Sequence, residues 1–153
     1  MRMHKSKPIS FLIHLSDFKN FLLSNFTLKI ASCLGFLAVV LGAFGAHILK
    51  AKISESSLDA FKTGVLYQLA HALLLLILGY LAPNSFWIKT ASKFFIIGIL
   101  LFSGSLYLLA TQSYFNHSMK FLGPITPMGG LCLMIGWLFL IIHAFKGNYS
   151  HEK

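Results

Sequence analysis

The sequence predicts an all-α integral membrane protein, a four-helix bundle preceded by an amphipathic helix. Composition is the first observation, because 56% of the 153 residues are hydrophobic, only 11% are charged and the mean hydropathy is +0.74. The second is that four stretches lack Asp, Glu, Lys and Arg, and each is long enough to cross a ~30 Å hydrocarbon core as a helix. These stretches are residues 30–49, 64–82, 94–111 and 127–145. Residues 30–145 therefore form the predicted membrane domain, between an N-terminal segment, 1–29, and a polar C-terminal tail, 146–153.

The N-terminal segment carries apolar side chains at three- and four-residue steps. They are Phe11, Leu15, Phe18, Leu22 and Phe26. Polar residues such as His14 and Asp17 gather on the opposite side of a helix with this spacing. These polar residues also interrupt the apolar run that a cleaved signal peptide requires. We expect an amphipathic helix that lies in the membrane interface, with its aromatic face toward lipid.

Small residues form a stripe along the first and fourth spans. They recur at steps of three, four or seven, which places them on one face of each helix. The stripes contain Gly35, Ala38, Gly42, Gly45, Gly129 and Gly136. Small residues let helix backbones approach closely, and this close packing drives helix association in lipid. We expect both stripes to be helix-packing seams.

Polar side chains lie in the first turns of the second span. Tyr67 and His71 share one helix face because they are four residues apart, and Gln68 is adjacent to that face. Polar groups in a membrane helix are costly and normally face the interior of the bundle. The first two spans should be antiparallel, so we expect His47, near the end of the first, to approach His71. These four residues form a candidate intramembrane polar site.

Two interpretations of this site are open. A hydrogen-bond clamp would fix the packing of the two helices, whereas a histidine pair would relay protons, since imidazole titrates near neutral pH. A metal or haem site is disfavoured because the spans contain no acidic residue to complete a ligand set. Cys33 and Cys132 stand far apart in the sequence, so neither has a nearby cysteine with which to form a metal or redox pair. We expect no catalytic residue, cofactor or metal.

An irregular segment precedes the fourth span. Its helix-breaking residues are Gly123, Pro124 and Pro127. The plain interpretation is a helix start, with Thr126 as N-cap and Pro127 in the first helical position. The alternative is a re-entrant or unwound element whose free backbone groups line a cavity. In the third span, we attribute the polar residues to core packing: Ser103, Ser105 and Tyr107.

Basic residues divide unequally between the two sides of the predicted bundle. Nine lie in the termini and the connection between the second and third spans, and four lie on the other side. The positive-inside bias then places both termini in the cytoplasm. The lysines are scattered through loops and form no basic helix face interleaved with aromatic residues. We therefore assign the charge to membrane topology and expect no nucleic-acid partner.

Five motifs occur in an order that resembles a known family. They are GAFGAH at 42–47, FKTG at 61–64 leading to YQLAHAL at 67–73, LFSGSLY at 101–107, GPITPMGG at 123–130 and GW at 136–137. From about Ile30 to Phe145 the chain resembles the YgdD/YwdK-like small bacterial inner-membrane proteins, a domain-of-unknown-function family to which vertebrate transmembrane protein 256 is also similar. The resemblance implies four spans in the bacterial cytoplasmic membrane and carries over no catalytic residue. The chain departs from the family pattern in the long segment 1–29.

These observations favour a non-enzymatic membrane protein. We expect an accessory or scaffolding bundle that lies in the lipid bilayer and packs through its glycine seams with a second copy or a larger membrane complex. The alternative is a small transporter or channel component with a polar histidine site between the first and second spans.

Overall fold

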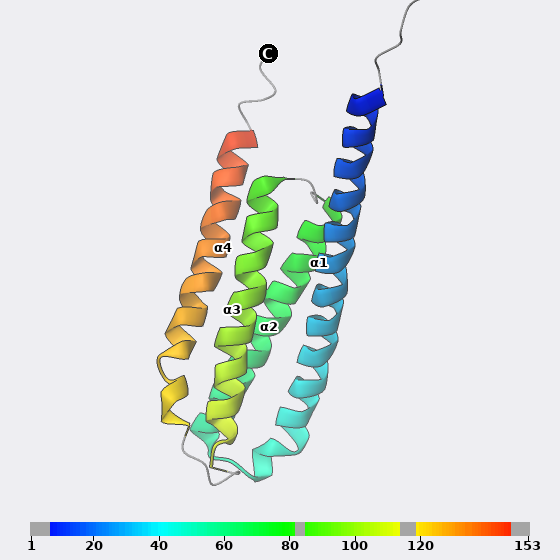
Figure 1. Ribbon diagram of the computed structural model, residues 1–153. Helices are drawn as coiled ribbons and strands as arrows, with labels where there is room; N and C mark the ends of the chain where they lie inside the picture. The colour runs from blue at the N-terminus through cyan, green and yellow to red at the C-terminus, as the bar shows by residue number, and fades with distance from the viewer. Residues whose placement is uncertain (1–6, 82–84, 114–118, 148–153) are drawn as a thin grey trace, which may run out of the picture.

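The computed structural model describes residues 7–81, 85–113 and 119–147, and of residues 7–25 it describes the backbone only. These parts of the chain contain helices and no strand. In chain order the elements are α1 (Lys7–His47), the 3-10 helix η1 (Leu49–Ala51), α2 (Glu55–Leu81), α3 (Phe86–Thr111), the 3-10 helix η2 (Lys120–Leu122) and α4 (Ile125–Gly147). Figure 1 shows the four long helices running up and down, so that α1 begins and α4 ends at the same end of the molecule.

Each long helix forms most or all of a segment that is apolar and long enough to cross a bilayer. The segments are Phe26–Ala51, Glu55–Tyr80, Phe86–Thr111 and Ile125–Lys146, with mean hydropathies of 2.0, 1.6, 2.1 and 2.1. The four predicted spans fall almost entirely inside these segments. The predicted all-α, four-span architecture is therefore confirmed, and the chain is a multi-pass membrane protein.

Helix α1 runs without a break from the N-terminal segment into the first span. The predicted boundary between residues 29 and 30 is therefore a change in composition and not the end of a helix. In Figure 1 the N-terminal part of α1 extends past the ends of the other three helices. Its location in the membrane interface stays a prediction.

Each helix packs mainly against the next one in the chain: α1 on α2, α2 on α3 and α3 on α4. Helices α1 and α4 lie on opposite sides of the molecule (Figure 1). Burial agrees with these outer positions: within the apolar 18-residue stretch of each segment, 17% of the residues are buried in α1 and α4 and 33% in α2 and α3. The four helices thus form an open series, with α2 and α3 in the centre.

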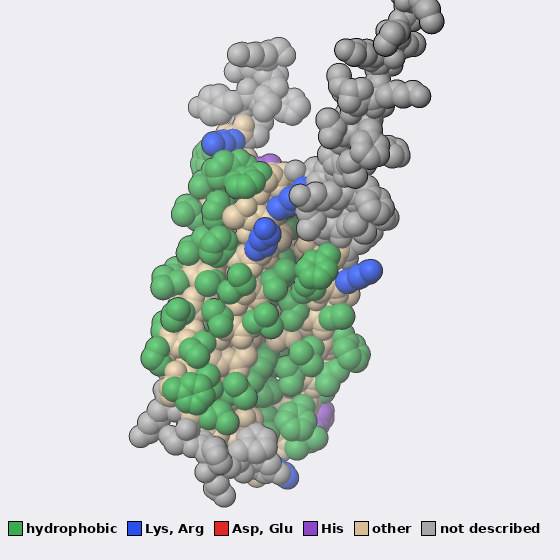
Figure 2. Space-filling view, in the orientation of Figure 1, with side chains coloured by type: hydrophobic (Ala, Val, Ile, Leu, Met, Phe, Trp, Pro, Cys, Tyr) green, Lys and Arg blue, Asp and Glu red, His purple; other side chains and the backbone are tan. Residues whose placement is uncertain are grey.

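Small side chains fill much of the interior, while large apolar side chains cover the outside. Ala31, Ala38 and Ala72 are fully buried, whereas Phe36 and Phe145 are more than 70% exposed. Figure 2 shows hydrophobic side chains over the whole length of the described spans on the visible face. This distribution suits a protein surrounded by lipid, because burying a large apolar side chain gains little when its alternative solvent is equally apolar.

The glycine stripes lie in contacts between helices of the same chain. A Cβ atom added at Gly45 would lie 3.0 Å from the Phe61 ring of α2, and one at Gly136 would lie 2.6 Å from the Phe95 ring of α3. At Gly129 an added Cβ would overlap the backbone nitrogen of Phe102. These glycines lie against the chain's own helices, so contacts with other chains need a different surface.

Candidate functional site

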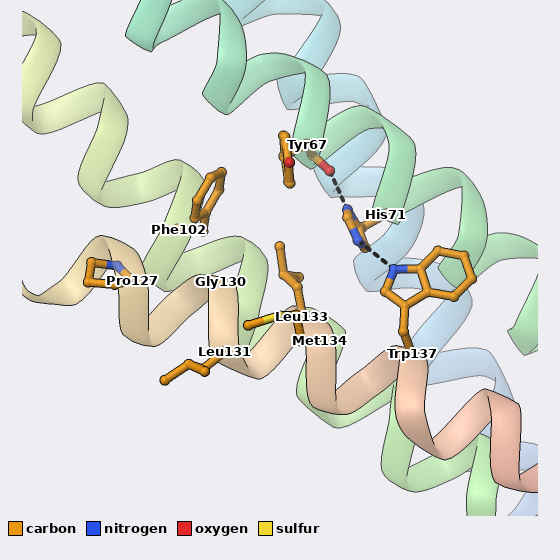
Figure 3. Close-up of a pocket in the computed structure, with 9 residues that line it drawn as sticks. All are labelled: Tyr67, His71, Phe102, Pro127, Gly130, Leu131, Leu133, Met134 and Trp137. Carbon is orange, nitrogen blue, oxygen red and sulfur yellow. Dashed lines mark hydrogen bonds between the residues drawn. The ribbon is translucent and has the colours of Figure 1, made fainter.

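His71 lies near the middle of α2 and connects that helix to α4. Its Nδ1 is 2.8 Å from the carbonyl oxygen of Tyr67, one helical turn earlier, and its Nε2 is 3.3 Å from Nε1 of Trp137. Because the carbonyl can only accept and the indole N–H can only donate, these contacts require Nδ1 to carry the imidazole proton. His71 therefore donates within α2 and accepts from α4, with 8% of its surface exposed (Figure 3).

Gln68 connects three helices. Its side-chain nitrogen donates to the carbonyl oxygen of Leu34 in α1 at 2.8 Å, and its side-chain oxygen accepts from the hydroxyl of Tyr107 in α3 at 3.0 Å. Gln68 is 2% exposed. A buried amide in a membrane helix is tolerated when its donor and its acceptor both have partners. This pair of hydrogen bonds fixes the position of α2 relative to both neighbours.

A groove of about 630 Å³ opens between α2, α3 and α4 beside His71. Its walls are Tyr67 and His71 from α2, Phe102 from α3, and the face of α4 between Pro127 and Trp137. Figure 3 shows the aromatic side chains of the three helices directed toward this space. No charged side chain is among the described residues that line the groove.

The aromatic rings at the groove are in contact with one another. The rings of Tyr67 and Phe102 are 4.7 Å apart between centroids, and those of His71 and Trp137 are 6.3 Å apart and nearly perpendicular. Tyr67 is 41% exposed, and its hydroxyl makes no hydrogen bond with any residue that the structure describes. The groove thus combines aromatic faces with one unpaired hydroxyl donor.

The irregular segment before the fourth span forms the start of α4. The helix begins at Ile125, so Thr126 is inside it and is not the N-cap. The hydroxyl of Thr126 instead lies 2.7 Å from the Ser105 hydroxyl of α3. Pro127 falls in the first helical turn, where its missing N–H leaves no helical hydrogen bond unmade. Its ring and the bare backbone of Gly130 contribute to the groove wall.

The structure brings Tyr67, Gln68 and His71 together but places His47 elsewhere. The α1 residues opposite the site are Leu34, which accepts from Gln68, and Gly35, which faces Ala72. His47 lies some 12 residues beyond them, or about 18 Å along the helix, and its side chain is exposed. The predicted approach of His47 to His71 is not observed, because α2 begins four turns before His71.

Two partners in the site were not predicted from the sequence. The sequence attributes Tyr107 to core packing and identifies Trp137 only within a family motif. A signal for both was available, since a tyrosine hydroxyl or an indole N–H within a membrane span needs an acceptor. The sequence could not say which acceptor each would find.

Residues 41–130 match the family described as a protein of unknown function, DUF423. UPF0382 membrane protein YwdK of Bacillus subtilis is 42% identical over 113 residues, which cover 72% of this chain and 88% of YwdK. The chain belongs to the DUF423 family. UPF0382 inner membrane protein YgdD of Escherichia coli K12 is 36% identical over 134 residues, covering 84% of this chain and 98% of YgdD. A UPF0382 membrane protein of Staphylococcus aureus is 43% identical over 111 residues, 72% of this chain and 87% of the relative.

The family assignment agrees with the resemblance found from the sequence motifs. The matched segment contains α2 with Tyr67, Gln68 and His71, and it reaches the start of α4. No solved structure matches the chain significantly. The names of these DUF423 relatives state a membrane location, and none of them states an activity.

Proposed function

We propose that this DUF423 protein is a non-enzymatic accessory or scaffolding subunit that acts through the outward faces of its spans. The supporting observation is that the polar groups of the second span bind neighbouring helices. Both ring nitrogens of His71 and both amide atoms of Gln68 have partners, three of the four on another helix. Such bonds hold the four helices as one rigid unit, as the hydrogen-bond clamp interpretation requires.

The outer helices supply the surface for partners. Large apolar side chains face outward on α1 and α4, among them Phe36, which is 72% exposed, and Leu138, which is 54% exposed. The glycine seams are unsuitable probes of assembly because Gly42 and Gly136 pack against Val65 and Phe95 of the same chain. Substitution by leucine at either glycine would disturb the bundle before any contact with another chain.

Crosslinking in native membranes followed by affinity purification tests this proposal. A scaffolding subunit is recovered with a second copy or a partner at a reproducible ratio, and Phe36→Ala or Leu138→Ala weakens that recovery while the monomer stays folded. Cys33 is exposed on α1 and provides a native crosslinking position, with Cys33→Ser as the matched control. Recovery of the monomer alone, at native expression and with several crosslinkers, contradicts the proposal.

We also propose that the protein lies in the cytoplasmic membrane with both termini in the cytoplasm. Lys29, Lys89, Lys93 and Lys146 lie toward the end of the bundle at which α3 begins and α4 ends, and Figure 2 shows several basic side chains there. At the opposite end, Asp59 forms an ion pair of 3.2 Å with Lys62 and reduces the net positive charge. The positive-inside bias supports this orientation.

Reporter fusions to the C-terminus test this orientation. A fluorescent protein that folds only in the cytoplasm should be fluorescent, and a phosphatase that is active only in the periplasm should be inactive. Phosphatase activity would contradict the proposed orientation.

One observation favours the second candidate, a small transporter or channel component. The groove reaches His71, an ionisable residue near the middle of the second span. A transporter would show pH-dependent flux in liposomes that is lost in His71→Ala while the bundle stays folded. The apolar lining and the occupied nitrogens of His71 make the scaffolding role the better supported of the two.

A further inference from the structure

The groove between α2, α3 and α4 has the size and the depth of a site for a membrane-dissolved ligand. Its volume of about 630 Å³ lies within the range of small-molecule sites, roughly 300–1,000 Å³. Tyr67 and His71 lie near the midpoint of the Glu55–Tyr80 span, and Trp137 lies near the midpoint of Ile125–Lys146. A ligand with a charged headgroup would have to move that charge to the centre of the bilayer, which is costly. The occupant is therefore uncharged.

The chemistry of the groove wall selects for a planar ring with hydrogen-bond acceptors. Tyr67, Phe102, His71 and Trp137 present aromatic rings on three sides, and such rings favour stacked or edge-to-face contact with another flat ring. The Tyr67 hydroxyl has no partner among the described residues and is available as a donor. The indole N–H of Trp137 is a second donor, and because its bond to His71 is long at 3.3 Å, a ligand carbonyl can share this proton without releasing His71. An acyl chain would fill the space but would leave the Tyr67 hydroxyl without an acceptor.

We propose that the groove binds a neutral amphiphile of the quinone class, with its carbonyl oxygens at Tyr67 and Trp137 and its alkyl or prenyl tail along α4. The tail would follow the apolar face formed by Leu131 and Met134, both more than half exposed. This is a binding proposal without a redox step, and it goes beyond the scaffolding role. The binding proposal does not depend on whether the chain has a partner protein.

Gly130 provides a way to close the groove without disturbing the bundle. A Cβ atom at Gly130 would lie 3.8 Å from the Phe102 ring, which is ordinary contact. A leucine at this position therefore projects into the groove and occupies it. Gly104 is the matched control, because a Cβ added there meets no atom within 4 Å beyond its own helix backbone. Both variants are checked by circular dichroism and by their elution in detergent.

Fluorescence quenching by decylubiquinone provides the measurement. The full chain with Trp87→Phe is reconstituted in phosphatidylcholine nanodiscs and titrated with decylubiquinone. This substitution leaves Trp137 as the one tryptophan in the sequence, so the fluorescence reports on the groove. The expected quenching is saturable, whereas the reciprocal variant Trp137→Phe, with Trp87 as the reporter, gives only the gradual quenching caused by quinone dissolved in lipid. In the Trp87→Phe background, Gly130→Leu abolishes the saturable phase and Gly104→Leu retains it. Tyr67→Phe keeps the ring, removes the donor and raises the apparent Kd about three- to tenfold.

Competition by decylbenzene tests the requirement for carbonyl groups. This compound has the same tail and a flat ring but no acceptor, so its apparent Kd, measured by displacement of decylubiquinone, should be at least threefold higher than that of decylubiquinone itself. Equal displacement would show a groove that takes any alkyl chain and would overturn the proposal. Quenching that is unchanged in both Gly130→Leu and Tyr67→Phe would equally overturn it. Recovery of a protein partner in the crosslinking experiment has no bearing on either result.

Discussion

Replacing Gln68 by leucine removes the polar connection between α1, α2 and α3 while nearly preserving side-chain volume. The substitution deletes two hydrogen bonds, the one to the Leu34 carbonyl at 2.8 Å and the one from the Tyr107 hydroxyl at 3.0 Å. Interhelical hydrogen bonds in membrane proteins contribute about 0.6 kcal/mol each, and up to ~2. The Tyr107 hydroxyl also loses its acceptor in a partly buried site, which adds roughly 1 kcal/mol. We expect the free energy of unfolding to fall by about 2 kcal/mol.

Unfolding by sodium dodecyl sulfate in mixed micelles, followed by far-ultraviolet circular dichroism, measures this change. A double-mutant cycle with Tyr107→Phe isolates one bond: in the Gln68→Leu background the tyrosine substitution should cost nothing or be favourable, because the hydroxyl is already without a partner. In the native background it should cost about 1 kcal/mol. Full stability of Gln68→Leu, or additive effects in the cycle, would refute the assignment of these two bonds as the connection between the helices.

Three further predictions concern single positions. Gly129→Ala should lower the unfolding free energy by more than about 2 kcal/mol, because its methyl group would overlap the Phe102 backbone, whereas Gly130→Ala should change it by less than about 0.5 kcal/mol; equal effects in the same detergent titration would contradict the packing of α4 on α3. Ser103→Ala should stabilise the bundle by up to ~1 kcal/mol, since the Ser103 hydroxyl is buried and unpaired among the described residues, and a loss of stability in thermal melts would reveal a partner. His47→Ala should leave stability within about 0.5 kcal/mol because the side chain is exposed; a loss of more than ~1 kcal/mol would show that His47 contributes to the packing.

The irregular segment 123–130 shows that sequence predicts the approximate start of a helix but not its first residue. Proline and glycine positions indicate a helix start, and α4 does begin there. The predicted first helical residue, Pro127, lies two positions after the observed one, Ile125. The Thr126 hydroxyl forms a hydrogen bond with the Ser105 hydroxyl of α3 and does not cap the helix. A contact with another helix decided the role of that hydroxyl. Helix ends are the least certain part of any assignment from sequence for this reason.

For the glycine stripes, too, the sequence predicts one property and the tertiary structure decides another. Their spacing identifies the packing face of each helix, and the structure uses those faces. Spacing alone does not say whether the neighbour is another helix of the same chain or one from a second molecule. Contacts such as Gly45 with Phe61 and Gly136 with Phe95 settle this for the folded chain. The surface left for partners is consequently the outward face of α1 and α4.

The amino-acid sequence by itself determined that this protein crosses a membrane four times and which residues are polar inside it. Hydropathy and helical periodicity depend on neighbours along the chain, so they can be read locally. Tertiary structure alone decided that His71 meets Trp137 and that His47 does not take part. Those outcomes depend on how far one helix slides and rotates against another. A shift of a single turn, about 5.4 Å, would pair different residues while leaving the hydropathy of every span unchanged.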